Sequence, residues 1–149
     1  MTTKSSGFTL IELMVVVAII GILSAAGVLS YKGYVSGAKK KSTENAMLQI
    51  SLAETEEYSN GGDYFTQAEG GTCTPKIEDS NEIETELFGG GDIIQTSNNY
   101  EICIAKSIAG NSYIVIAEEQ VDDPEKKCTI TLTANGTWTR KIVATSKDF

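Results

Sequence analysis

The sequence predicts an α+β fold, in which a long N-terminal α-helix packs by its C-terminal half on a four-stranded antiparallel β-meander. Three observations predict this fold. Residues 8–29 are almost all apolar, a helical spacing continues without proline to about residue 60, and residues 99–149 alternate apolar and polar side chains between tight turns. A sheet of four short strands is not stable alone, so one of its faces must lie on the helix.

The first element is the apolar stretch at residues 8–29. As a helix its 22 residues are about 33 Å long, close to the thickness of a bilayer's hydrocarbon core. Glu12 is its one charged residue, and a carboxylate inside a membrane span costs about 2.5–3.5 kcal/mol. Glu12 therefore indicates a function beyond anchoring. A cleaved secretory signal is the weaker alternative, because its apolar region is usually about 7–15 residues long.

The helical pattern continues beyond the apolar stretch. Apolar and small residues recur at steps of three and four up to Ala53, while Lys39, Lys40, Lys41 and several glutamates occupy the other side. The residues at 58–62, including two glycines, provide a helix stop. The sequence thus predicts one helix over residues 8–60, which must protrude from any domain that the remaining chain can build.

The next region, residues 61–98, has no sustained period. It is rich in glycine and carries an acidic run from Glu78 to Glu86. We expect a long irregular loop with a short helix through Ile83–Leu87, because structureless stretches of this length are uncommon in compact domains unless they are functional.

Residues 99–149 are expected to form the sheet. Period-two alternation predicts strands beginning at Tyr100 and covering residues 113–117, 128–133 and 138–143. The last two are joined through Asn135-Gly136, a strong hairpin signal. Short connections between consecutive strands predict an antiparallel meander.

Composition excludes several classes of function. The net charge is −8, and from Glu44 onward there are 19 acidic residues against seven basic ones, so nucleic acid is not an expected partner. Four lysines between Lys32 and Lys41 form the one basic segment. The chain has no histidine, the commonest general base and metal ligand. We expect no enzymatic activity and no cofactor; a membrane-tethered enzyme is the alternative from another class.

Three cysteines, Cys73, Cys103 and Cys128, allow at most one disulfide within the chain. Cys128 has the same parity as the apolar residues of its strand and is expected in the core, whereas Cys103 is out of phase with its neighbours. Cys73 pairing with Cys128 or with Cys103, and a Cys103–Cys128 pair, all stay open. We favour a bridge that includes Cys128.

Three other groups are weak candidates for sites. Asp122, Asp123 and Glu125 offer oxygen ligands for calcium, but they lack the spacing of a dedicated loop, and a solvated acidic turn is the better interpretation. Asn135-Gly136-Thr137 matches a glycosylation sequon, which its turn role explains better. A basic patch beside Trp138 is a weak candidate for a DNA contact, because the distal region as a whole is strongly acidic. Its members are Lys126, Lys127, Arg140 and Lys141.

The stretch from Gly7 to Leu23 resembles the N-terminus of type IV pilins and pseudopilins. The resemblance rests on a short charged leader, glycine before Phe8, and Glu12 as the fifth residue after that junction. A weaker likeness extends from Tyr100 to Trp138. The resemblance as a whole implies a type IV pilin-like fold. It also implies a structural subunit that polymerises through its N-terminal helix into an extracellular filament for motility, adhesion or DNA uptake. A pseudopilin of a type II secretion system is the alternative.

The same resemblance assigns roles to particular residues. Residues 1–7 would be a leader that a prepilin peptidase removes between Gly7 and Phe8, followed by N-methylation of Phe8. Glu12 would pair with the N-terminal ammonium of a neighbouring copy's Phe8. Many type IV pilins carry a proline near the end of the apolar run, where this chain has Leu29. Because that proline is missing, the resemblance gives weaker support to local melting of the helix around Gly21 in the filament than it does to the other roles.

The resemblance also implies partners and a location. The partners are other pilin copies, the peptidase, the inner-membrane assembly machinery and, before assembly, the lipid bilayer. The precursor would cross the inner membrane once with its N-terminus in the cytoplasm and then leave for an extracellular filament. Lys39, Lys40 and Lys41 work against a simple positive-inside rule, so the orientation rests on the resemblance alone.

Overall fold

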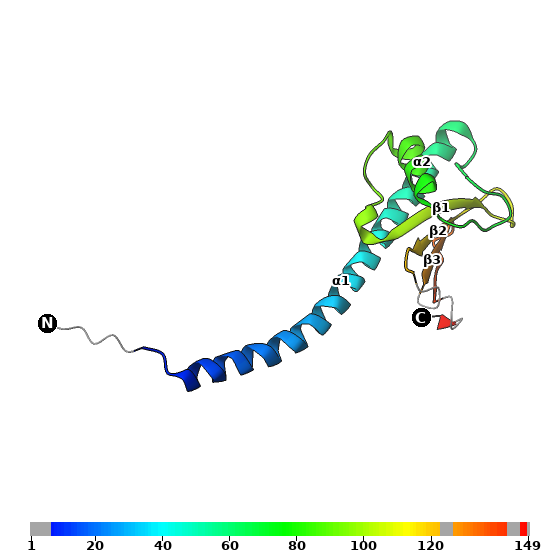
Figure 1. Cartoon of the computed structure of the whole chain (residues 1–149). Helices are drawn as coiled ribbons and strands as arrows, with labels where there is room; N and C mark the ends of the chain where they lie inside the picture. The colour runs from blue at the N-terminus through cyan, green and yellow to red at the C-terminus, as the bar shows by residue number, and fades with distance from the viewer. Residues whose placement is uncertain (1–6, 123–126, 143–146, 149) are drawn as a thin grey trace. The chain divides into compact units, whose positions relative to one another are not determined.

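The structure, a computed structural model, describes residues 7–122, 127–142 and 147–148. It divides into two compact units, residues 1–38 and 39–149, and helix α1 contributes to both (Figure 1). The elements in chain order are α1 (Leu10–Gly61), α2 (Ile77–Phe88), the 3-10 turn η1 (Thr96–Asn98), β1 (Tyr100–Lys106), β2 (Tyr113–Glu119), β3 (Cys128–Thr133), β4 (Trp138–Ile142) and β5 (Lys147–Asp148).

The first unit is the apolar half of α1. Every side chain described between Gly7 and Tyr34 is exposed. By length and composition α1 is able to cross a membrane, with a mean hydropathy of 2.6 in its most apolar window. Aliphatic side chains on all sides of a helix are typical of a segment that lies in lipid or among other helices. The long apolar helix that the sequence predicts is confirmed.

In the second unit α1 buries one face against the sheet. Ala46, Met47 and Ile50 lie in the core with side chains from β1, β2 and β3. The Ser51 hydroxyl and the Tyr113 hydroxyl are 2.7 Å apart and share a hydrogen bond. Their three- and four-residue spacing places these residues on one side of the helix, which is why this half of α1 packs on a sheet.

An ion pair joins the sheet to the same stretch of helix. Arg140, on β4, donates from Nε and Nη2 to Glu44 Oε1 at 2.7 Å each, while Lys41 Nζ lies 2.8 Å from Oε2. Burial opposes ionisation of Glu44, but the hydrogen bonds from Lys41 and Arg140 outweigh it and hold the pKa of this carboxyl below its usual value. The carboxylate thus fixes β4 on the helix.

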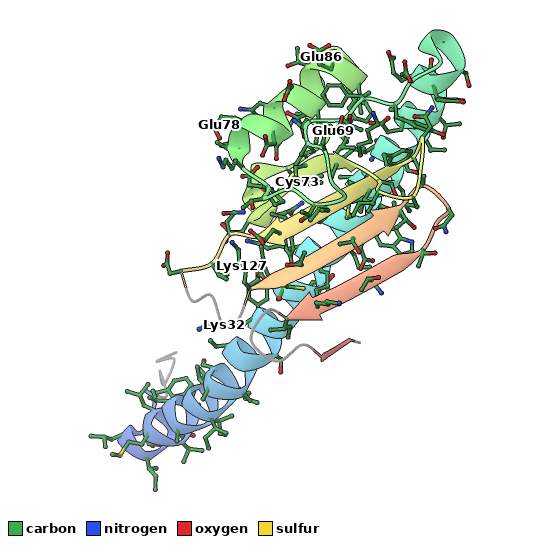
Figure 2. The ribbon with its side chains drawn as sticks, turned by 90° about the vertical axis from the view of Figure 1, so that its right-hand side faces the viewer. Lys32, Glu69, Cys73, Glu78, Glu86 and Lys127 are labelled. Carbon is green, nitrogen blue, oxygen red and sulfur yellow. A yellow bond between two sulfur atoms is a disulfide. The ribbon has the colours of Figure 1, made fainter. Side chains whose placement is uncertain are left out.

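The sheet is the predicted antiparallel meander. Each strand pairs with the next in the order β1-β2-β3-β4, in a register that places Ile102 opposite Ala117, Ala117 opposite Ile130, and Ile130 opposite Arg140. The two-residue strand β5 adds a fifth member beside β4, which the sequence analysis did not anticipate. Figure 2 shows the strands lying across the second half of α1.

Helix α2 is longer than the sequence predicts. It occupies 12 residues, starting at Ile77, whereas the predicted helix covers only residues 83–87. Its first turn is acidic, and Asp79 Oδ2 accepts a hydrogen bond from Lys76 N at 2.9 Å, which satisfies one of the free N–H groups at the helix start. Only Ile83 is both apolar and buried in this helix. The apolar pattern alone therefore locates its centre and misses its start.

The segment before α2 and the first turn of α2 close the free edge of the sheet at β1. Successive outward N–H groups of β1 find partners there: Ile102 N donates to Ser80 Oγ at 3.0 Å and Ile104 N to Gln67 Oε1 at 3.1 Å. The next one, Lys106 N, donates to the backbone oxygen of Ala68 at 2.7 Å. An exposed edge strand invites pairing with another chain, and these contacts remove that possibility at β1.

The favoured disulfide is wrong, because Cys73 pairs with Cys103 and Cys128 remains a buried free thiol. Cys128 does lie in the core that faces α1, as its parity predicts. Cys103 lies on the opposite face of the sheet, in a small cluster with Ala105 and Ile116. The segment that carries Cys73, labelled in Figure 2, runs beside β1 and covers that opposite face, where it can reach Cys103 and not Cys128.

The disulfide is expected to stabilise the second unit. The bridged residues are 30 apart in sequence, and a loop of that size corresponds to about 3–4 kcal/mol in the chain-entropy account. Reduction, or a Cys73→Ser and Cys103→Ser double variant, should lower stability to denaturant by about this amount. Trp138, the one tryptophan, packs against the core and reports unfolding by its fluorescence. In the matched Cys128→Ala variant, reductant should still lower the stability by the full amount. If the stability of this Cys128→Ala variant did not respond to reductant, the bridge would have to include Cys128.

Glu54 is an unusual core residue, with no exposed surface. Its Oε2 accepts a hydrogen bond from Phe65 N at 3.0 Å, while Oε1 has no hydrogen-bond partner within the described parts of the chain. Burial raises the pKa of Glu54 from 4.5 to about 7; the nearby charge of Glu57 adds to the increase and the Phe65 bond opposes it.

This carboxyl should make the second unit less stable as the pH rises. Between pH 4.5 and about 7 the folded protein keeps a proton on Glu54 that the unfolded chain has lost, so stability falls across that window by about 3 kcal/mol and then stays level. Denaturant unfolding in detergent at several pH values measures the slope. Glu54→Gln should flatten it, and exposed Glu56→Gln should not; equal slopes in all three proteins would refute the assignment.

Candidate assembly site at the start of the helix

Residues 7–9, directly before α1, are exposed. Phe8 is 83% exposed, and apart from Gly7 and its chain neighbours no described residue has an atom within 4 Å of the position that a Cβ on Gly7 would occupy. The peptide bond between them precedes the first helical residue, Leu10. An exposed peptide bond outside regular secondary structure is what a peptidase requires of its substrate. The structure therefore leaves the predicted Gly7–Phe8 junction open to processing.

Glu12 is hydrogen-bonded within its own helix start. Its Oε2 accepts from Thr9 N at 2.9 Å and from Thr9 Oγ1 at 2.6 Å, and Thr9 Oγ1 lies 3.3 Å from Glu12 N. This is a capping box, in which the residue before the helix and the third residue within it satisfy each other's free groups. Thr9 was not among the predicted site residues, although the Thr-x-x-Glu spacing before an apolar run is the sequence signal of this cap.

The cap leaves part of the carboxylate available. Both bonds from Thr9 go to Oε2, and Oε1 receives no hydrogen bond from any described residue. Around the carboxylate, apolar side chains line a shallow depression of about 310 Å³, contributed by Phe8, Ile11, Val15 and Val16. The site thus offers one fixed anionic oxygen in otherwise apolar surroundings.

Gly21 lies within the uninterrupted helix α1, with open space where a Cβ would be. Glycine costs about 1 kcal/mol relative to alanine in a helix, so this turn is a weak one. The predicted melting concerns the filament and stays a prediction.

The weaker candidates of the sequence analysis gain no support. Asp122 is exposed, and Asp123, Glu125 and Lys126 lie outside the described residues. Two side chains of the basic patch have acidic partners, since Lys127 Nζ lies 2.5 Å from Glu118 and Arg140 binds Glu44.

The sequon residues form a turn. Asn135 Oδ1 accepts a hydrogen bond from Thr137 N at 3.1 Å, and Gly136 has a positive φ of 82°. Glycine adopts such a conformation without steric cost, so the turn explains this residue pattern.

Comparison with known proteins agrees with this site. Residues 2–28 match the model of the prokaryotic N-terminal methylation motif. Fimbrial protein Q of Moraxella bovis is 30% identical over 93% of this chain and 94% of its own length. Fimbrial protein EcpC of Eikenella corrodens is 32% identical over 71% of this chain and 70% of its own. Type IV major pilin protein PilE1 of Neisseria gonorrhoeae is 37% identical to this chain in a stretch that covers 50% of this chain and 35% of its own length.

No solved structure matched the chain. The relatives carry the names of fimbrial proteins and pilins, and they do not favour the secretion pseudopilin alternative. The methylation motif covers the leader junction, Glu12 and most of the apolar run, and the similarity to Fimbrial protein Q extends over nearly the whole of both chains. This chain belongs to the type IV pilin family, the structural subunits of pili.

Proposed function

We propose that this chain is made as a membrane-anchored precursor, is cut between Gly7 and Phe8, and then polymerises through α1 into an extracellular pilus. Cleavage removes Lys4, the one charged side chain of the leader, and creates an amino group on Phe8, which the family motif suggests is methylated. Before cleavage the apolar half of α1 holds the precursor in the inner membrane with the leader on the cytoplasmic side. A prepilin peptidase and the assembly machinery of that membrane are the partners at this stage.

The exposed first half of α1 supports polymerisation. Outside a membrane, a helix with apolar side chains on every side is stable only when other apolar groups cover it. Copies of the same helix supply such a cover, and a head-to-tail contact between identical subunits generates an open helical filament. Lipid covers the helix before assembly, and neighbouring helices cover it afterwards.

Glu12 is the single observation that carries the proposal. An unpaired carboxylate at the bilayer centre costs about 2.5–3.5 kcal/mol, although one near the end of a span costs less. In a filament, the new ammonium of a neighbour's Phe8 can approach Oε1, the oxygen that Thr9 leaves free. In dry surroundings this pair is strongly attractive, while either charge alone is penalised. Glu12 therefore favours the filament over the membrane and fixes the offset between neighbours.

Substitutions at Glu12 and Thr9 separate pairing from capping. Glu12→Leu and Glu12→Gln should still insert in the membrane but yield at least tenfold fewer filaments by electron microscopy, because neither can pair with an ammonium. Thr9→Ala keeps the carboxylate and loses the hydroxyl of the cap, at about 1 kcal/mol of helix stability. It should assemble at close to the normal level.

Two results would contradict this assignment. Normal filament numbers from Glu12→Gln would show that the charge is not needed. An equal loss in Thr9→Ala and Glu12→Leu would assign Glu12 to capping its own helix. Membrane fractionation of all variants shows whether insertion is preserved.

A further inference from the structure

The second unit carries a shallow groove of mixed polar and apolar lining that the assembly site does not use. It has a volume of about 270 Å³ and lies between the outer side of α1 and the end of α2. Leu52 is 72% exposed there, and the remaining lining comes from Gln49, Ala53, Glu56, Leu87 and Phe88. Leu52 therefore offers apolar surface that a partner could bury, beside the half-buried ring of Phe88.

Both helices that form this groove carry acidic residues. Helix α2 has five acidic residues and no basic one, and Figure 2 labels two of them, Glu78 and Glu86. On α1, the lining contributes the carboxylate of Glu56, which is exposed, as is the adjacent Glu57. A partner for the groove therefore needs apolar or aromatic side chains together with a positive charge.

A segment of the same chain has this chemistry. Tyr31 and Tyr34 are 68% and 76% exposed, and Lys32 between them is exposed and forms no ion pair with any described residue. Tyrosine and lysine at the end of a membrane span favour the lipid–water interface. Once the subunit leaves the membrane, both rings and the charge lose that surrounding.

We propose that, in the pilus, the Tyr31–Tyr34 segment of one copy docks in this groove of another copy. The tyrosine rings cover Leu52 and Phe88, and Lys32 approaches Glu56. The proposal commits to a second copy because opposite charges and two exposed apolar surfaces occur on one chain, as a head-to-tail contact requires. It rests on the proposed polymerisation.

The contact implies a definite offset between the two copies. On α1, the docking segment and the groove residues are centred about 20 positions apart, which is about 30 Å along a helix. Pairing of Glu12 with Phe8 spans only four positions, or about 6 Å. The groove therefore contacts a different neighbour from the one that pairs with Glu12, and it links subunits that are further apart in the filament.

Cysteine crosslinking in assembled filaments tests the contact. Residues 34 and 52 are about 27 Å apart along one helix, and a disulfide needs Cα atoms within about 7 Å, so Tyr34→Cys with Leu52→Cys can bridge only between copies. Oxidation of filaments from this double variant with copper phenanthroline should give a ladder of covalent multimers. The control pair is Tyr34→Cys with Ile108→Cys, whose isoleucine is 83% exposed and outside the groove.

The outcomes separate this proposal from the proposed function. Filaments that form without a ladder, or equal ladders from both pairs, overturn the groove contact and leave polymerisation intact. A wild-type protein that never forms filaments refutes the proposed function itself.

If the cysteine variants do not assemble, a charge exchange decides. Lys32→Glu and Glu56→Lys should each reduce the number of filaments, and the two together should restore it. Failure of the combined variant to recover any filaments overturns the contact.

Discussion

The structure depends on a helix that its own chain covers over only part of its length. α1 has 52 residues, and its buried side chains begin at Thr43, beyond an apolar half in which all described side chains up to Tyr34 are exposed. Water cannot solvate such a surface without a large hydrophobic cost. The protein therefore needs a second environment at every stage, first lipid and then other copies of itself. In the function proposed above, Glu12 makes the contact with other copies preferable to lipid.

The rest of the fold directs association to that helix. Residues 67–80 satisfy the outward N–H groups of β1, so this strand cannot pair with the sheet of another copy. The Cys73–Cys103 bridge fixes the same segment on the sheet. The Glu44–Arg140 ion pair fixes β4 on α1. These contacts hold the second unit together and close its sheet at β1, which supports the proposal that subunits associate through helices.

The sequence predicted the features that repeat along the chain and missed those that depend on single contacts. Helical and period-two patterns predicted α1 and the meander, because each rests on many residues. The predicted disulfide pairing was wrong because strand parity gives the face of the sheet on which a cysteine lies but not the path of the loop that carries Cys73. The start of α2 was missed because its first turn is polar. The cap at Thr9 had a recognisable signal, whereas burial of Glu54 depends on tertiary packing.

A helical reconstruction of the pilus by cryo-electron microscopy tests the central claim most directly. The account predicts a core made of the first halves of α1, with a Glu12 carboxylate oxygen within about 4 Å of the N-terminal nitrogen of a neighbour's Phe8. A filament held together by its sheets, or one in which Glu12 faces only Thr9 of its own chain and Phe8 lies elsewhere, would contradict it.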